Sequence, residues 1–244
     1  MPVRTAAQYI DSLKDDRSIY IEGERIKDVT KDNRFVGAAE TMAELLQMQH
    51  EKDLKEVLTY NSPTSGDKVG MSHIQPKSKD DIKARGDAMK VWMDATCGML
   101  GRSPDYKNVM VSAWAAAAKS FERETFDGSA NIKNYYEYVR ENDLMMTHVL
   151  VNPQVDRSRP AHLQESEIVA QIVKETDAGI IVRGARMVAT LCALANEIIV
   201  MPAAVTWLTN EEHKTTNYAF GFAIPTSTPG LKFICRPPVG HLSA

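Results

Sequence analysis

The spacing of hydrophobic residues changes along this chain from a helical period to an alternating one. Up to about residue 146, hydrophobic side chains recur every three or four positions, which is the spacing of a helix with one buried face. Beyond residue 158 they alternate with polar side chains, as in strands that are buried on one side. We predict helices at residues 4–14, 35–49, 78–100 and 130–143, and one more that begins at Ser103. The pattern therefore predicts an α+β protein with its helices first.

Short β-branched runs between turn residues predict the strands. A small hairpin is expected at residues 18–21 and 25–29, turning at Gly23. A buried strand at residues 147–151 should end before Pro153, because proline cannot donate to a ladder. The later strands are expected to pair antiparallel and lie at residues 168–173, 179–182, 197–200, 218–224 and 231–235. Because strands and helices do not alternate, a doubly wound nucleotide-binding sheet is not expected.

Two helix starts carry capping signals. A Ser-x-x-Asp pattern opens the helix at residues 78–100, whose core side is predicted to contain Ile82, Met89, Trp92, Met93 and Met99. At residues 103–105, Ser-Pro-Asp combines a capping residue, a proline suited to a first turn and a carboxylate that complements the helix dipole. This start would place Arg102 immediately before a helix N-terminus and Tyr106 in the first turn.

Composition narrows the class of protein. The chain has 244 residues, of which 43% are hydrophobic, enough for a sizeable core in one or two domains. A net charge of −3 with both signs interspersed gives no case for nucleic acid or an anionic membrane as a partner. The sequence shows neither a signal peptide nor a long apolar run, so neither export nor a membrane span is predicted. Cys97, Cys192 and Cys235 lie far apart, which argues against a disulfide framework or a zinc site and favours a reducing cytoplasm.

Several fingerprints of cofactor binding and catalysis are missing. The sequence contains no GxGxxG after a strand, no GxxxxGK[ST], no GxSxG and no HExxH. Binding of NAD(P)H by the usual fold is therefore not expected.

A run of polar groups accompanies the predicted strand at residues 147–151. His148 lies within the strand, and Asn152, Asp156 and Arg157 follow it on a loop. Polar groups at a strand end beside a domain junction often form a ligand site. A lone histidine among apolar residues is, however, more often a satisfied core residue, so both interpretations stay open for His148.

Arg102, Tyr106 and His148 make a stronger case together than singly. An arginine at a helix N-terminus, with a tyrosine hydroxyl one turn later, favours an oxyanion such as a phenolate. If His148 reaches the same point, it could take the phenol proton, and deprotonation makes the neighbouring ring carbon nucleophilic. Taken alone, Arg102 is more often a surface or capping residue and Tyr106 a core residue.

Several motifs resemble the oxygenase components of the 4-hydroxyphenylacetate 3-monooxygenase family. In chain order they are RTAAQYI (4–10), PTSG (63–66), GRSPDY (101–106), YYEYVRENDL (135–144), NPQVDRS (152–158) and GARMVAT (184–190). The resemblance implies a two-component, FADH2-dependent monooxygenase on an acyl-CoA dehydrogenase-like scaffold. In that family, reduced FAD from a separate NAD(P)H-dependent flavin reductase and O2 convert a phenol such as 4-hydroxyphenylacetate to a catechol.

The same resemblance implies roles for individual residues. Arg102, Tyr106 and His148 would be the catalytic residues, which hold the substrate hydroxyl. The FAD-binding residues would be His148, Val149, Leu150, Gln154, Val155, Asp156, Arg157 and Thr190, the last near flavin N5. No metal site is expected. Residues 201–216, where the family has a substrate-selecting loop, do not resemble it, so 4-hydroxyphenylacetate is only the default phenol.

The chain is shorter than the members of that family. We expect an N-terminal mainly helical domain at residues 1–146 and a middle β-barrel domain, incomplete here, at residues 147–244, without the family's C-terminal helix bundle. The implied partners are a phenol, O2, the reductase, and either a homo-oligomer (a tetramer in the family) or a complementing C-terminal chain. Two other interpretations stay open. One is a truncated or split fragment without activity, and the other is an acyl-CoA dehydratase or dehydrogenase, for which three cysteines supply no evident iron–sulfur ligand set.

Overall fold

The computed structural model describes residues 3–124, 126–153, 155–156, 158–159, 161–164, 168–202 and 215–237. It contains helices and strands together, as the hydrophobic pattern predicted. Contacts between residues divide the chain into two compact units. The first comprises Met1–Met146, Ala193–Asn196 and Thr226–Ala244, and the second comprises Thr147–Cys192 and Glu197–Pro225. The chain therefore leaves the first unit after Met146 and returns to it twice.

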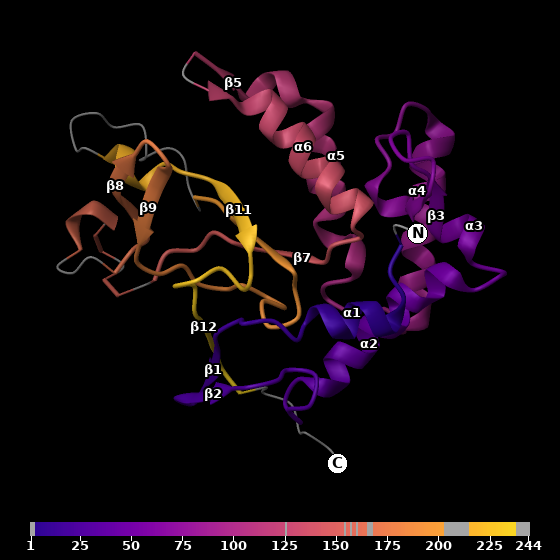
Figure 1. The fold of residues 1–244 in the computed structure, drawn as a ribbon, viewed down its shortest axis with the longest axis horizontal. Coiled ribbons are helices and arrows are strands. Elements are labelled where there is room, and N and C mark those ends of the chain that lie inside the picture. The colour runs from indigo at the N-terminus through magenta and orange to yellow at the C-terminus, as the bar shows by residue number, and fades with distance from the viewer. Residues whose placement is uncertain are drawn as a thin grey trace. The chain divides into compact units, whose positions relative to one another are not determined.

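Helices dominate the first unit (Figure 1). They are α1 (Ala6–Ser12), α2 (Val36–Gln47), α3 (Lys55–Leu58), α4 (Lys79–Ala95), α5 (Asn108–Ala116) and α6 (Gly128–Glu141), with 3₁₀ turns η1 (Met48–His50), η2 (Met71–His73), η3 (Pro104–Tyr106) and η4 (Ala118–Phe121). Thr5 caps α1 in a capping box with Gln8, and Ser78 caps α4 in the same way. Figure 1 shows α5 and α6 side by side. No helix in the described part of the chain is both long and apolar enough to cross a membrane.

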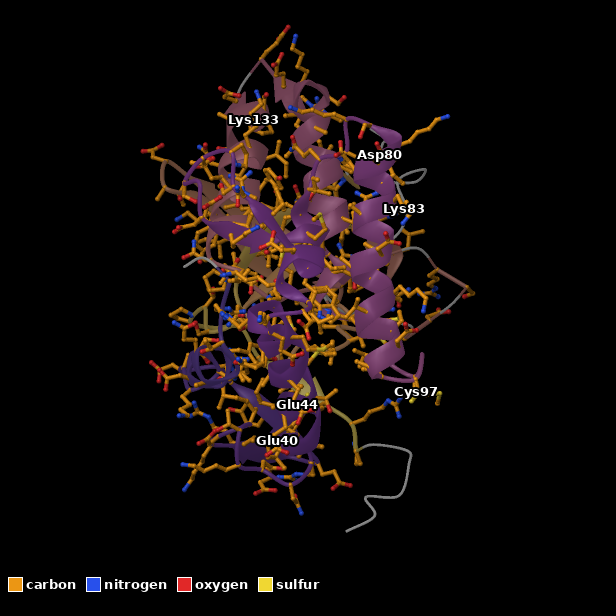
Figure 2. All side chains as sticks on the ribbon, turned by 90° about the vertical axis from the view of Figure 1, so that its right-hand side faces the viewer. Glu40, Glu44, Asp80, Lys83, Cys97 and Lys133 are labelled. Atoms are coloured by element: carbon orange, nitrogen blue, oxygen red, sulfur yellow. The ribbon has the colours of Figure 1, made fainter. Side chains whose placement is uncertain are left out.

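The end of α4 differs from the prediction. The helix stops at Ala95 rather than near residue 100, because Cys97 and Gly98 adopt positive φ angles of 52° and 70°. Met99 thus lies beyond the helix and is 86% exposed, and Ile82 is 57% exposed, so the predicted core side was wrong at both positions. Trp92 is buried as predicted. Figure 2 labels Asp80 and Lys83 on α4, and exposed Cys97 after its end.

The helix expected to begin at Ser103 also starts elsewhere. Ser103, Pro104 and Asp105 open only the 3₁₀ turn η3, and α5 itself begins at Asn108. The Ser103 hydroxyl donates to the Asp105 carboxylate and accepts no backbone N–H, so it does not cap the helix. The Ser-Pro-Asp sequence, which favours a helix N-terminus, therefore begins a 3₁₀ turn here.

The described strands of the first unit form small sheets. β1 (Ile19–Ile21) and β2 (Glu24–Ile26) pair antiparallel across Glu22-Gly23, where φ is 50° and 84°, which confirms the predicted hairpin. β12 (Phe233–Cys235) pairs parallel with β1, so the antiparallel pairing predicted for the last strand was wrong. Hydrophobic alternation indicates the two faces of a strand but not its partner. The remaining pairs are β3 (Thr59–Asn61) with β4 (Lys68–Gly70), and β5 (Glu122–Arg123) with β6 (Phe126–Asp127).

A short segment from late in the sequence, Ala193–Asn196, is part of the first unit. Arg17 donates from Nη1 to two of its carbonyl oxygens, at 2.7 and 3.0 Å. The Tyr9 hydroxyl donates to a third carbonyl at 2.8 Å, and Arg4 donates from Nη2 to Asn196 Oδ1 at 2.9 Å. Side chains of the N-terminal region thus satisfy the buried polar groups of this segment.

The second unit is mainly β-structure. Strands β7 (Met146–Val149), β10 (Glu197–Val200) and β11 (Phe222–Pro225) form a sheet in the order β11-β10-β7. Strands β8 (Gln171–Thr176) and β9 (Gly179–Arg183) form an antiparallel pair, which confirms the hairpin predicted there. The 3₁₀ turns η5 (Ala161–Leu163) and η7 (Thr215–Tyr218) complete the described elements. Among the described residues these strands do not close into a barrel, so the barrel stays a prediction.

Candidate active site

Arg102, Tyr106 and Lys107 form a compact cluster just before α5. The guanidinium carbon of Arg102 lies 4.1 Å from the centre of the Tyr106 ring. The ammonium nitrogen of Lys107 lies 3.9 Å from the same centre. Both distances suit cation–π contacts. The structure thus brings together two of the predicted site residues and adds a second cation that the sequence had not indicated.

No carboxylate forms an ion pair with either cation in the part of the chain that the structure describes. Arg102 donates from Nη1 to the Gly101 carbonyl at 2.9 Å, and its Nε is buried without a hydrogen-bond partner. The residue Lys107 is only 6% exposed, and its ammonium lies 3.8 Å from the weak acceptor Met110 Sδ. Burial, and then repulsion from Arg102, lowers the pKa of Lys107 to about 8. The cluster is therefore electropositive and suited to an anion.

Buried hydrogen bonds to η2 hold the first turns of α5. Asn108 donates from Nδ2 to Ser72 Oγ at 2.9 Å. Ser112 donates from Oγ to the His73 carbonyl at 3.0 Å. Because Lys107 directly precedes Asn108, these bonds also fix the backbone that carries the cations. A site on such a rigid element loses little freedom when a ligand binds.

His148 lies in the second unit, half-buried on β7. Beyond the end of this strand, Val151 forms an isolated antiparallel bridge with Met187. At the other end of the strand, Thr147 donates its hydroxyl to the Thr190 carbonyl. The segment that carries His148 therefore runs alongside the segment that carries Thr190. Two of the predicted flavin positions thus lie on neighbouring segments of one unit.

The backbone beside Thr190 is strained. Val188 has a φ of 66° and Leu191 a φ of 65°, in the left-handed region. This conformation is a clear outlier for a β-branched residue such as Val188, which is also 65% exposed. Strain of this kind persists only where the surrounding structure enforces it, and it concentrates at ligand sites.

Gly184 sets how closely this segment approaches the residues that directly precede β8. Its φ is +117°, and an added Cβ would lie 2.6 Å from the carbonyl carbon and oxygen of Val169. Ala185 donates its N–H to the Ile168 carbonyl at 2.7 Å. Only glycine fits this close approach without a backbone shift.

The remaining predicted flavin residues lie on β7 and on the loop that follows it. Val149 is buried, Leu150 is half-buried and Val155 is 61% exposed. Asp156 accepts the Ser158 hydroxyl at 2.7 Å and the Ser158 N–H at 2.9 Å, and these bonds lower the pKa of Asp156. Its carboxylate therefore stabilises its own loop. Gln154 and Arg157 lie outside the described residues.

Arg186 is a candidate that sequence reasoning did not single out, although it lies within the GARMVAT motif. It donates from Nη1 to Asn152 Oδ1, and its Nε is buried without a hydrogen-bond partner. Its guanidinium carbon lies 5.5 Å from the centre of the Phe220 ring. Burial lowers the pKa of Arg186, and no carboxylate among the described residues is paired with it. Arg186 is thus a second place where a positive charge lacks a counter-charge.

Comparison with known sequences decides the family. A sequence profile described as "4-hydroxyphenylacetate 3-hydroxylase N terminal" matches residues 5–243, nearly the whole chain. The chain belongs to this family. A 4-hydroxyphenylacetate 3-hydroxylase relative from Thermus thermophilus, the "4-hydroxyphenylacetate 3-monooxygenase oxygenase component", is 45% identical over 235 residues. That match covers 96% of this chain but 46% of the relative, so the chain spans about half the length of the curated relatives it matches.

Solved structures agree with this assignment to the 4-hydroxyphenylacetate 3-hydroxylase family. An oxygenase component (HpaB) of 4-hydroxyphenylacetate 3-monooxygenase, complexed with FAD and 4-hydroxyphenylacetate, matches with a TM-score of 0.85 at 45% identity. The match covers 96% of this chain and 47% of that one. An archaeal 4-hydroxybutyryl-CoA dehydratase from N. maritimus matches with a TM-score of 0.80 at 20% identity, covering 95% of this chain and 45% of that one. The likeness to the dehydratase shows a shared fold only.

Proposed function

We propose that this chain is the N-terminal part of the oxygenase component of a two-component flavin monooxygenase. It would use O2 and reduced FAD, delivered by a separate NAD(P)H-dependent flavin reductase, to hydroxylate a phenol such as 4-hydroxyphenylacetate ortho to its hydroxyl. The observation that carries the proposal is the cluster of cations around Tyr106, which no carboxylate among the described residues neutralises. The related structure with FAD and 4-hydroxyphenylacetate bound supports the choice of cofactor and substrate.

Arg102 and Tyr106 hold the phenol oxygen of the substrate. A guanidinium and a phenol hydroxyl both donate to an oxyanion, and Arg102 has no carboxylate partner in the described residues. An ionised phenol carries more electron density on its ortho carbon, which makes that carbon a better nucleophile. These groups therefore favour the reactive form of the substrate and hold it in one orientation.

His148 accepts the phenol proton or holds it in a hydrogen bond. A histidine is the side chain whose ordinary pKa best suits proton transfer near neutral pH. The assignment of this role rests on the resemblance of its stretch to the family. The substitution described below therefore tests His148 separately from Arg102.

The second unit holds the flavin through Thr190, residues 148–150 and the loop at 154–157. Three features of its described residues support a flavin site. The backbone beside Thr190 is strained, Met187 and Val188 expose apolar surface that suits a flat ring, and Arg186 offers an uncompensated charge to an anionic part of the cofactor. When bound, reduced FAD supplies the electrons that activate O2, while the protein supplies orientation and excludes water.

The larger architecture follows the same family. The strands of the second unit would form part of a β-barrel on an acyl-CoA dehydrogenase-like scaffold, covered by a C-terminal helix bundle. A homo-oligomer or a complementing C-terminal chain would supply what the second unit leaves uncovered. We also place the working enzyme in the cytoplasm, where its reductase partner is expected.

The proposal is tested by measuring catechol against hydrogen peroxide with supplied reduced FAD. The assay is run with this chain alone and again with the C-terminal part of the Thermus thermophilus relative added as a separate polypeptide. Arg102→Ala and His148→Ala should each slow hydroxylation by about 10²-fold, the scale of losing a positioned charge or acid–base group. The variants should instead release the oxygen as peroxide. Tyr106→Phe should be milder, because it loses one hydrogen bond of about 0.5–1.5 kcal/mol and keeps the ring.

Two results would contradict the proposed roles. Catechol formation that is absent from every combination with the unmodified chain would remove the proposed activity. Unchanged coupling of reduced FAD to catechol in the His148→Ala variant would make His148 a core residue without a catalytic role.

A further inference from the structure

Lys107 is a buried charge that the proposed mechanism does not use. It is 6% exposed, and no oxygen acceptor or carboxylate is paired with its ammonium among the described residues. Burying an ammonium without a counter-charge is unfavourable, because the charge loses its hydration. A lysine that only packs its stem would leave its ammonium well exposed, whereas the whole of Lys107 is 6% exposed. The position of Lys107 therefore needs a reason beyond packing.

The geometry places Lys107 against the same aromatic ring as Arg102. Both cations lie about 4 Å from the centre of the Tyr106 ring, at 3.9 and 4.1 Å. The two positive charges repel each other, and repulsion from Arg102 contributes to the low pKa of Lys107. A bound anion would attract both cations and so offset the repulsion between them. A neutral ligand would not.

We propose that Lys107 is a second phenolate-binding residue, which acts with Arg102 to select the ionised form of an aromatic ligand at the Tyr106 ring. This inference rests on the proposed function. In the binding step the O–H bond of the phenol breaks, the oxygen keeps the electron pair, and the proton goes to His148 and from there to water. Lys107 remains an ammonium and stabilises the phenolate by its charge.

Binding of a phenolate and the pKa of Lys107 must affect each other, so the inference can be measured in the unmodified chain. If a phenolate binds near Lys107, the pKa of the lysine must rise from about 8 towards its ordinary value when the site is occupied. Conversely, the pKa of the bound phenol must fall. An opposite charge within hydrogen-bonding range typically lowers such a pKa by about 1–3 units.

The test uses 4-nitrophenol, which ionises near neutral pH and whose phenolate is yellow. The absorbance of the bound ligand is measured against pH for the 244-residue chain and for Lys107→Met, Lys107→Arg and Lys133→Met. Lys133 is the matched control, because it is an exposed lysine on α6 of the same unit, labelled in Figure 2. In parallel, NMR of reductively methylated lysines follows the pKa of Lys107 with and without 4-nitrophenol.

The expected result separates charge from packing. The pKa of bound 4-nitrophenol should lie below that of the free ligand, and it should rise by about one unit or more in Lys107→Met. Lys107→Arg keeps the charge and should stay close to the unmodified chain, as should Lys133→Met. The phenolate should also bind about tenfold more weakly to Lys107→Met. In the unmodified chain, the ligand should raise the pKa of Lys107.

Different failures have different meanings. If the unmodified chain lowers the pKa of 4-nitrophenol and Lys107→Met lowers it equally, the inference about Lys107 is overturned and the proposed function survives. The same holds if ligand binding leaves the pKa of Lys107 unchanged. If the unmodified chain binds no 4-nitrophenol at all, both the phenol site and the role of Lys107 are overturned.

Discussion

Among the described residues, the first unit contains most of the buried polar side chains, and the second, although smaller, contains most of the exposed large apolar ones. The first buries many polar side chains, among them Arg17, Gln49, Ser72, His73, Lys107, Asn108, Ser112, Arg140 and Asp143. The second leaves apolar side chains in solvent, among them Val155, Leu163, Val173, Ile180, Ile181, Met187 and Val188. In β9 the neighbours Ile180 and Ile181 point to opposite faces, so neither face of this ribbon is polar throughout.

This difference suggests that the first unit is a scaffold and the second a binding surface. In the first unit, hydrogen bonds from Arg17, Tyr9 and Arg4 satisfy a crossing segment, so the fold rests on its own residues. In the second, strain beside Thr190 and exposed apolar side chains are unfavourable in the isolated chain. We interpret the second unit as a surface on which a planar cofactor and a further layer of protein can pack.

The largest effect is expected where the first unit holds its crossing segment. Arg17→Met removes the guanidinium donor from two buried carbonyl oxygens, of which, in the described part of the chain, only that of Ala195 keeps another donor, the Thr226 hydroxyl at 2.9 Å. It also leaves Asp15 without its ion-pair partner. Breaking a buried charged network by removing one member typically lowers the free energy of unfolding by about 3–5 kcal/mol. Urea unfolding, followed by Trp fluorescence, measures the free energy of unfolding of each variant. Arg25→Met, at an exposed position on β2, should change it by less than about 0.5 kcal/mol. A similar small loss in both variants would mean that the crossing segment does not stabilise the first unit.

A second comparison of variants concerns the backbone of the second unit. Gly184→Ala adds a Cβ where φ is +117° and a carbonyl lies 2.6 Å away, whereas Gly179→Ala adds one where φ is +131° and no atom lies within 4 Å. Both variants carry the strain of a positive φ, and only Gly184→Ala adds the clash. We expect Gly184→Ala to lower stability by about 1–3 kcal/mol more than Gly179→Ala. Amide hydrogen exchange in the second unit measures the difference, and equal protection would show that the close approach at Val169 is unimportant.

A smaller effect, taken for each unit of pH, is expected from the pH dependence of the first unit. His73 is fully buried, and neither of its ring nitrogens has a hydrogen-bond partner among the residues that the structure describes. Burial, followed by repulsion from Arg140, lowers its pKa from 6.5 to about 3. Between these values the unfolded chain binds a proton that the folded chain does not. Stability should therefore be full above pH 6.5 and fall by about 1.4 kcal/mol for each pH unit below it. Urea unfolding at several pH values checks this, and His73→Phe should remove that part of the slope. An unchanged slope would place the titrating group elsewhere.

The sequence predicted the fold best where structure is local. The hairpin at β1 and β2 follows from a two-residue turn at Glu22-Gly23, and Trp92 is buried because it lies on the inner face of α4. The end of α4 was missed although Gly98 marked it, because the apolar spacing continues to Met99. The parallel pairing of β12 was missed because its partner lies at the other end of the sequence.

The candidate site shows the same limit. Arg102 and Tyr106 were found because they belong to a recognisable motif, and their closeness follows from one short turn. Lys107 was missed because a lysine beside a motif looks like any surface lysine, and only the fold buries it. Arg186 was missed for the same reason. Burial without a counter-charge is a property of the folded chain, and no spacing in the sequence reports it.

The central claim is that this chain retains the flavin site of its family in the second unit. Titration of FAD into the chain, followed by flavin fluorescence, tests this directly. Arg186→Met is compared with Arg183→Met, because Arg183 is an exposed arginine on β9 of the same unit. We predict saturable binding of one FAD per chain, weakened about tenfold or more in Arg186→Met and unchanged in Arg183→Met. Absence of saturable FAD binding by the unmodified chain would contradict the account.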